Sequence, residues 1–308
     1  MIHYIKVVNY LSEELTMYLR RPGETGLSIV KIDGLTPADA IINTTELAPT
    51  TKLSGGDLFN SSKIAKRNVV IYMKYFDWYE DVETLRHKTY KYFPVGRMLT
   101  LYVYTDSRHV KLTGWVESNG GDVFASDCDV RISILCPDPY MYSADINSLV
   151  NTNFSGIENS LVFPLVNPSL TENQIIFGII HAQTENLIVY NGDVETGLFV
   201  YIHSVGTIEN IKIINSITRE LMGIDNNLLI DTIGTGIIAG DDIIINTTIG
   251  AKSITLVRNG VAYNILNAKT GTDWLTLVKG DNLFAFTAEF GIANLQLRME
   301  NLIVYEGI

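Results

Sequence analysis

Cys128-Asp129-Val130-Arg131-Ile132-Ser133-Ile134-Leu135-Cys136 alternates apolar and polar side chains. Val130, Ile132 and Ile134 share one parity with both cysteines, whereas Asp129, Arg131 and Ser133 share the other. Successive side chains of a β-strand point to opposite faces, so this pattern predicts a strand with one buried face. Both thiols are expected to point into the core.

The two cysteines are the only ones in the chain. On one strand they would lie roughly 26 Å apart at ~3.3 Å per residue, and a disulfide needs Cα atoms within about 7 Å. We therefore expect two reduced, buried thiols, as in a protein that folds in a cytoplasm.

The same alternation recurs in other stretches of the first half of the chain. It predicts that this half is mainly β, as in a β-sandwich domain. Leu99, Leu101 and Val103 are a second example. The predicted strands are 3–10, 13–21, 26–34, 68–76, 98–106, 109–118 and 123–136.

One segment, residues 77–92, has helical spacing instead. Trp78, Val82, Leu85, Thr89 and Tyr92 form one mainly apolar stripe, which predicts an amphipathic helix. Acidic residues gather in its first turns and basic residues in its last, an order that complements the helix dipole. The carboxylates are interpreted as solvated charges and not as acid-base catalysts.

Between Leu35 and Arg67 the chain is polar and shows no sustained period. Structureless connections longer than about 12 to 15 residues are usually functional arms or disordered segments. Residues 36–67 are therefore predicted to form an extended arm that reaches a neighbouring subunit, with a merely floppy loop as the alternative.

Pro137-Asp138-Pro139 and the polar residues that follow predict a domain boundary, with domains of 1–145 and 146–308. Short strands without a convincing helix indicate that the second domain is a β-sandwich or jelly roll. The predicted strands are 174–181, 185–190, 198–203, 208–214, 227–232, 241–246, 252–258, 261–265, 274–278, 282–289 and 294–305.

Charge and hydropathy exclude several classes of protein. The net charge is −11, with 46% hydrophobic and 19% charged residues, which excludes a largely disordered chain. Residues 1–145 hold 16 Lys/Arg against 18 Asp/Glu, a net of −2, and residues 146–308 hold 7 against 16, a net of −9. Specific nucleic-acid binding and membrane insertion are not expected, because there is no basic patch and no apolar run of membrane-spanning length.

No motif identifies an enzyme or a cofactor. Gly234-Thr235-Gly236-Ile237-Ile238-Ala239 matches the dinucleotide pattern and follows an expected strand, Leu228 to Thr232, but it leads into another strand where that fold needs a helix. The histidines stand far apart and no zinc motif appears. Asp231, Asp241, Asp242 and Asp273 could gather around calcium, yet turn chemistry explains them. We assign no catalytic residue, no cofactor and no metal.

Carbohydrate binding is an open alternative for the second domain. Trp274, Tyr263 and Tyr201 could offer flat aromatic faces to a sugar. They also alternate with Leu, Ile and Val, so core packing is the competing interpretation. Trp274 and Tyr263 are the candidate carbohydrate contacts.

The order of features resembles the distal tail protein family of long-tailed bacteriophages, over nearly the whole chain. In the first half the resemblance rests on residues 68–76, then the helix, then Tyr92-Phe93-Pro94-Val95-Gly96-Arg97, Gly114-Trp115-Val116-Glu117 and Cys136-Pro137-Asp138-Pro139-Tyr140. In the second half it rests on residues 191–197, Asp231-Thr232, Val257-Arg258-Asn259-Gly260, Trp274-Leu275, Gly280-Asp281-Asn282 and Tyr305-Glu306-Gly307.

The resemblance implies a structural virion protein and not an enzyme: a homohexameric ring at the tail tip, assembled in the host bacterial cytoplasm. Expected partners are other copies of the chain, the tail tube protein, the tail-tip protein and, through a galectin-like second domain, receptor-binding proteins. The arm would clasp ring neighbours, with Asn43, Thr45, Leu47, Lys52 and Leu53 as interface candidates. The alternative function is a carbohydrate-binding adhesin that contacts the host surface directly.

Overall fold

The computed structural model describes residues 1–21, 24–46, 57–121, 129–145, 150–158, 179–182 and 184–308. Contacts divide the chain into two units. The first consists of Met1–Ile146 with Val304–Ile308, and the second of Asn147–Ile303. The chain thus leaves the first unit once and returns to it at its end, whereas the sequence had assigned these last residues to the second domain.

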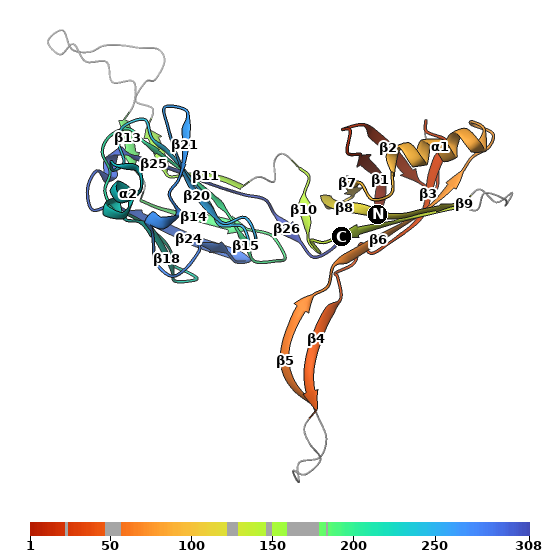
Figure 1. Cartoon of the computed structure of the whole chain (residues 1–308), viewed down its shortest axis with the longest axis horizontal. Helices are drawn as coiled ribbons and strands as arrows, with labels where there is room; N and C mark the ends of the chain where they lie inside the picture. Colours follow the sequence, from red (N-terminus) through yellow and green to blue (C-terminus); the bar gives the residue numbers. More distant parts are fainter. Residues whose placement is uncertain (22–23, 47–56, 122–128, 146–149, 159–178, 183) are drawn as a thin grey trace, which may run out of the picture. The chain divides into compact units, whose positions relative to one another are not determined.

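A closed barrel forms the first unit (Figure 1). Its seven strands are ordered β8-β7-β1-β2-β3-β6-β9, and β9 pairs with β8 to close the ring. Only the short β2–β3 pairing is parallel. The bounds are β1 (Ile2–Val8), β2 (Glu14–Leu19), β3 (Leu27–Asp33), β6 (Arg67–Tyr75), β7 (Met98–Thr105), β8 (His109–Gly121) and β9 (Asp129–Cys136).

The barrel closes where β8 passes from β7 to β9. Residues from Met98 pair with the first part of β8, and β9 pairs with its second part. A Cβ on Gly114 would lie 2.7 Å from the Sγ of Cys136 and 2.7 Å from the side chain of Ile134. Glycine is required here because the two strands approach too closely for any side chain.

The predicted burial of β9 is confirmed for the residues that the structure describes. Val130, Ile132, Ile134 and Cys136 are all buried, so one face of the strand does line the barrel core. Cys128 lies outside the described residues. Cys136 is a free thiol.

Helix α1 (Val82–Tyr92) begins five residues later than predicted. Asp81 caps it, its side chain accepting a hydrogen bond from the backbone N–H of Glu83 at 3.1 Å. Trp78 precedes the cap in a turn and is 70% exposed, so its place on the apolar stripe was wrong. Leu85 and Thr89 form the buried face.

Two short strands extend the barrel sheet beyond β8. They are β10 (Met141–Ser143) and β26 (Val304–Tyr305), which pair antiparallel with each other while β10 also pairs with β8. Arg108 donates a hydrogen bond to the carbonyl of Gly307 at 2.7 Å, and the backbone N–H of Ile308 donates to Leu35 at 3.2 Å. These contacts hold the chain's last residues on the first unit.

The second unit is a sandwich of two sheets around one core. Buried side chains such as Val200 and Ile243 from one sheet share a cluster with Ile213 and Phe284 from the other. The six-stranded sheet runs β11 (Val150–Asn153), β25 (Leu295–Asn301), β16 (Phe199–Ser204), β19 (Asp242–Asn246), β20 (Ser253–Arg258), β21 (Val261–Asn264). The five-stranded sheet runs β14 (Glu185–Tyr190), β24 (Gly280–Thr287), β17 (Ile211–Asn215), β18 (Glu220–Ile224), β22 (Lys269–Thr270).

Short elements complete this unit. They are the pairs β12 (Ser155–Glu158) with β13 (Ile179–Ala182) and β15 (Thr196–Gly197) with β23 (Thr276–Leu277), and two 3₁₀ turns, Leu266–Ala268 and Ile292–Asn294. The predicted strand 174–181 falls mostly outside the described residues. Strand β18 was not predicted.

The strand expected at 227–232 is wrong: residues Asn226–Ile233 form helix α2. Asp225 caps its start by accepting hydrogen bonds from the backbone N–H groups of Asn227 and Leu228, and Gly234 ends it with a left-handed φ of 82°. These residues are ordinary helix start and stop signals. The apolar run between them fits a strand or a helix, and the two caps favour the helix.

The mainly β class is confirmed, with a sandwich in the second unit and a closed barrel in the first, where a sandwich was expected. Within the described ranges, no helix is long and apolar enough to cross a membrane.

Candidate interaction sites on the arm and the sandwich

The predicted arm contains a β-hairpin and is not structureless. β4 (Ala40–Glu46) pairs antiparallel with β5 (Asp57–Ile64), with a bulge after Asn43 (Figure 1). The two strands form a sheet of their own, and every side chain of β5 is exposed. Because both faces of the hairpin are exposed, neither set of alternate residues has to be apolar. This explains why apolar and polar residues do not alternate in its sequence.

Apolar side chains nevertheless lie on this hairpin. Ile42 and Phe59 are each 61% exposed, and Ile41, Leu58 and Ile64 are exposed as well. Because Ala40 opposes Ile64, Ile42 opposes Ser62 and Thr44 opposes Phe59, the side chains of Ile42, Phe59 and Ile64 share one face. An isolated two-stranded hairpin is marginally stable in water, so an apolar face of this kind suits contact with another chain.

Two of the predicted arm residues hold the hairpin together. Asn43 donates to the hydroxyl of Ser61 at 3.0 Å, and the hydroxyl of Thr45 accepts from Asn60 at 2.6 Å. Their side chains therefore have partners within the arm. Leu47, Lys52 and Leu53 lie outside the described residues.

A buried guanidinium fixes the root of the arm. Arg67, 3% exposed, donates to the main-chain carbonyls of Pro139 at 2.7 Å, Gly34 at 2.7 Å, Thr36 at 2.5 Å and Glu306 at 2.5 Å. Burial lowers the pKa of Arg67 from its usual value. The planar guanidinium has several N–H donors and can therefore bind several carbonyls at once. Through these bonds Arg67 joins both ends of the arm to the chain's last segment.

The outer face of the six-stranded sheet contains a hollow of about 570 Å³, which we call the sandwich hollow. Its floor is formed by the half-buried side chains Tyr201, Ile244 and Val257. Its rim is formed by Asn153, His203, Asp242, Gln296 and Arg298. The register places Asn153, Arg298, Tyr201 and Ile244 in one row across the sheet, and Gln296, His203, Asp242 and Val257 in the next.

Charged groups of the sandwich hollow are paired locally. His203 Nδ1 lies 2.7 Å from Asp242, and the guanidinium of Arg298 lies 3.1 Å from Glu300 and 4.6 Å from the centre of the Tyr201 ring. Burial raises the pKa of Tyr201, and the charge of Glu300 adds to the effect. The hollow therefore presents fixed donors and acceptors with little net charge.

The predicted carbohydrate residues lie elsewhere on the second unit. Trp274 packs partly buried against the core, and the ammonium groups of Lys252 and Lys269 lie over its ring, each 5.3 Å from the centroid. Tyr263 is exposed on β21. Neither lines the sandwich hollow, whereas Tyr201 does.

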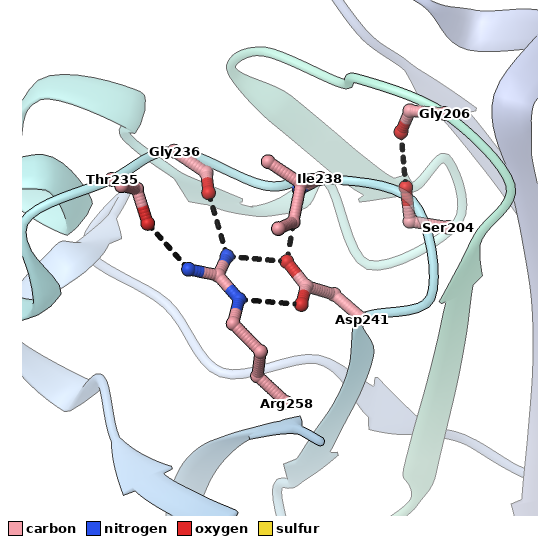
Figure 2. A network of polar contacts seen from close by, with 7 residues as sticks. All are labelled: Ser204, Gly206, Thr235, Gly236, Ile238, Asp241 and Arg258. Atoms are coloured by element: carbon pink, nitrogen blue, oxygen red, sulfur yellow. Dashed lines mark hydrogen bonds and ion pairs between the residues drawn. The ribbon is translucent and has the colours of Figure 1, made fainter.

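The loop with the dinucleotide pattern is held by an ion pair. Asp241 is completely buried and binds Arg258 through both carboxylate oxygens, at 2.7 and 2.6 Å. Figure 2 shows how Arg258 also reaches the hydroxyl of Thr235 and the carbonyl of Gly236, while Asp241 accepts from the N–H of Ile238. The segment joins α2 to β19, so its glycines follow a helix where the dinucleotide fold needs them to precede one.

The four aspartates considered for calcium are not brought together. Asp241 is committed to Arg258 and Asp242 to His203. In the part of the chain that the structure describes, no group of three His, Cys, Asp or Glu side chains could hold a metal ion.

Comparison with solved structures matches nearly the full length of the chain. The Dit protein (gp 19.1) of SPP1, described as a paradigm of the hub adsorption apparatus in phages infecting Gram-positive bacteria, aligns over 97% of this chain and 98% of its own, with TM-score 0.63 and 9% identity. The chain has the fold of a phage tail hub protein. A chain of the phage P2 baseplate in its activated conformation with Ca aligns over 98% of both chains at 12% identity, with TM-score 0.47. No family model and no curated protein sequence matches.

The Dit fold confirms the resemblance that the sequence predicted, at the level of fold. Two features of this chain were not predicted. Arg67 carries no motif, and its four carbonyl partners are distant in sequence. The sandwich hollow combines five strands whose pairing depends on long-range register, although the alternation of Tyr201 and His203 with buried Val200 and Ile202 was a visible signal.

Proposed function

We propose that this chain is a structural component of a bacteriophage particle, a distal tail protein that forms a ring at the tail tip. The observation that carries the proposal is the alignment with SPP1 Dit along 97% of the chain at TM-score 0.63. A hub role needs extended binding surfaces and no catalytic residue, so we propose no enzymatic activity.

The first unit is proposed to build the ring, with six copies as the expected number. The arm hairpin supports this role, because its exposed apolar side chains need a partner and a neighbouring copy can supply one. Asn43 and Thr45 would then act by fixing the hairpin's shape, and Ile42 and Phe59 by contacting the neighbour.

The proposed partners are the tail tube protein on one side of the ring and the tail-tip protein on the other. Receptor-binding proteins would attach to the sandwich, for which a galectin-like topology stays a prediction. The protein would be made in the host bacterial cytoplasm and end in the virion. A net charge of −2 over residues 1–145 suits a ring through which DNA passes, because a basic wall would retain a polyanion.

Negative-stain electron microscopy tests this function. The purified chain is imaged alone and mixed with its neighbouring tail proteins, and averages are analysed for rotational symmetry. A six-fold ring with an open centre is expected in at least one preparation. Monomers in both, with no added partner density, would refute the hub.

A second candidate function is a carbohydrate-binding adhesin, favoured by the sandwich hollow and its polar rim. Glycan binding without ring formation would select it. Glycan binding together with rings would place a sugar site on a hub.

A further inference from the structure

The sandwich hollow has an apolar floor and a polar rim. Tyr201 and Ile244 are half-buried at the floor, whereas His203, Asp242 and Arg298 are exposed around it. A pyranose ring has the matching division, with a face of C–H groups and an edge of hydroxyls. We propose that the sandwich hollow is a binding site for a neutral saccharide.

The rim offers the hydrogen-bonding groups that vicinal hydroxyls need. Asp242 accepts, Arg298 donates, and Asn153 and Gln296 each do both. The guanidinium of Arg298 is stacked on the Tyr201 ring at 4.6 Å, and Asp242 is held by His203 at 2.7 Å. These contacts pre-orient the rim groups, which lowers the entropy cost of binding.

Local charge favours a neutral ligand over an anionic one. Arg298 is compensated by Glu300 at 3.1 Å, and Asp242 adds a negative charge beside the floor. A phosphate or carboxylate on the ligand would therefore meet the carboxylate of Asp242 and a guanidinium that is already paired with Glu300.

The size and chemistry of the hollow also favour a saccharide over a protein partner. A volume of about 570 Å³ lies in the range of small-ligand sites. Protein interfaces are anchored mainly by large exposed aromatic side chains, Met and Arg. Here Arg298 lies over the Tyr201 ring, and the floor residues Ile244 and Val257 are partly covered. The rim residues are polar throughout.

Saturation-transfer difference NMR on the full chain tests the proposal. The probes are D-glucose, D-galactose, N-acetyl-D-glucosamine and L-rhamnose, with glucose 6-phosphate as the anionic comparison. Saturation of ring C–H protons is expected for at least one neutral sugar, and a weaker effect for the phosphate.

Variants locate the site. Tyr201→Ala, Arg298→Gln and Asp242→Asn should each weaken binding at least tenfold, and the last two change exposed side chains that leave the core intact. Tyr263→Ala is the matched aromatic control and Ser253→Ala the control on the same sheet, and both should bind as the wild type does. Folding of each variant is checked by circular dichroism.

Three results would overturn the proposal: no saturation of any neutral sugar, binding that survives all three hollow variants, or stronger binding of glucose 6-phosphate than of glucose. Capture of a tail protein that these variants abolish, without sugar binding, would also overturn it and make the hollow a protein interface. Ring formation is measured separately, so failure of either proposal leaves the other standing.

Discussion

The guanidinium of Arg67 donates a hydrogen bond to the main-chain carbonyl of Glu306, 239 positions further along the chain. The same side chain binds carbonyls at Gly34 and Thr36, where the arm begins, and at Pro139. All four acceptors are neutral carbonyls, and the nearby charge of Asp138 also favours the buried guanidinium. One side chain thus fastens three separate segments to the start of β6.

Replacing Arg67 with Lys should destabilise the first unit by about 2 kcal/mol, because an ammonium cannot span four carbonyls. The free energy of unfolding is measured by urea unfolding in a Trp274→Phe background. In that background the fluorescence of Trp78 and Trp115 reports the first unit alone. Lys66→Ala, at the adjacent exposed position, is the control. Equal midpoints for the two variants would contradict a fastening role for Arg67.

Asp241→Asn should destabilise the second unit by roughly 3 kcal/mol, because it leaves the partly buried guanidinium of Arg258 without its counter-charge. Asp242→Asn, one position further and exposed, should change stability by less than about 0.5 kcal/mol. Trp274 fluorescence reports this unit in a Trp78→Phe, Trp115→Phe background. The proposal fails if the two substitutions cost the same.

Ile42→Ser with Phe59→Ser should abolish ring formation and leave the monomer folded, because both side chains are exposed in the single chain. Electron microscopy measures the rings and circular dichroism the fold. Leu187→Ser, an equally apolar exposed change on the second unit, should leave the rings intact. Rings formed by the arm variant would remove the arm from the interface.

Cys136 should resist thiol reagents in the folded protein. Burial raises its pKa from 9.0 to about 11, and the folded state therefore favours the neutral thiol. This contribution to stability is complete below pH 9 and is lost as the pH rises through about 11. A Cys128→Ser variant isolates Cys136: Ellman's reagent at pH 8 should label it only in urea. Rapid labelling without urea would show that the thiol is accessible.

Elements with one buried face were predictable from the sequence, and elements without one were not. The alternation in β9 and β7 is visible because a barrel core covers one side of each strand. The arm hairpin is exposed on both faces, so burial imposes no period on its sequence. Helix α2 was mistaken for a strand because its short apolar run fits either structure, although Asp225 and Gly234 mark its two ends.

The candidate sites were harder to predict because they depend on register. Tyr201 was recognised as a possible sugar contact, but its neighbours Arg298 and Ile244 come from strands far along the chain. Trp274 looked equally suitable, and only the packing shows two lysines over its ring.

The chain departs for the second unit after β10 and comes back into β26, and these two strands are antiparallel neighbours. Both connections therefore emerge at the same end of the pair. A pulling force on the sandwich draws β10 and β26 in one direction, so it does not shear them against each other. The force acts instead on the hydrogen bonds between β10 and β8, and on those that Arg67 and Arg108 donate to the carbonyls of Glu306 and Gly307. Mechanical tension is thus borne by the strand that closes the barrel, and single-molecule pulling should open the first unit along β8.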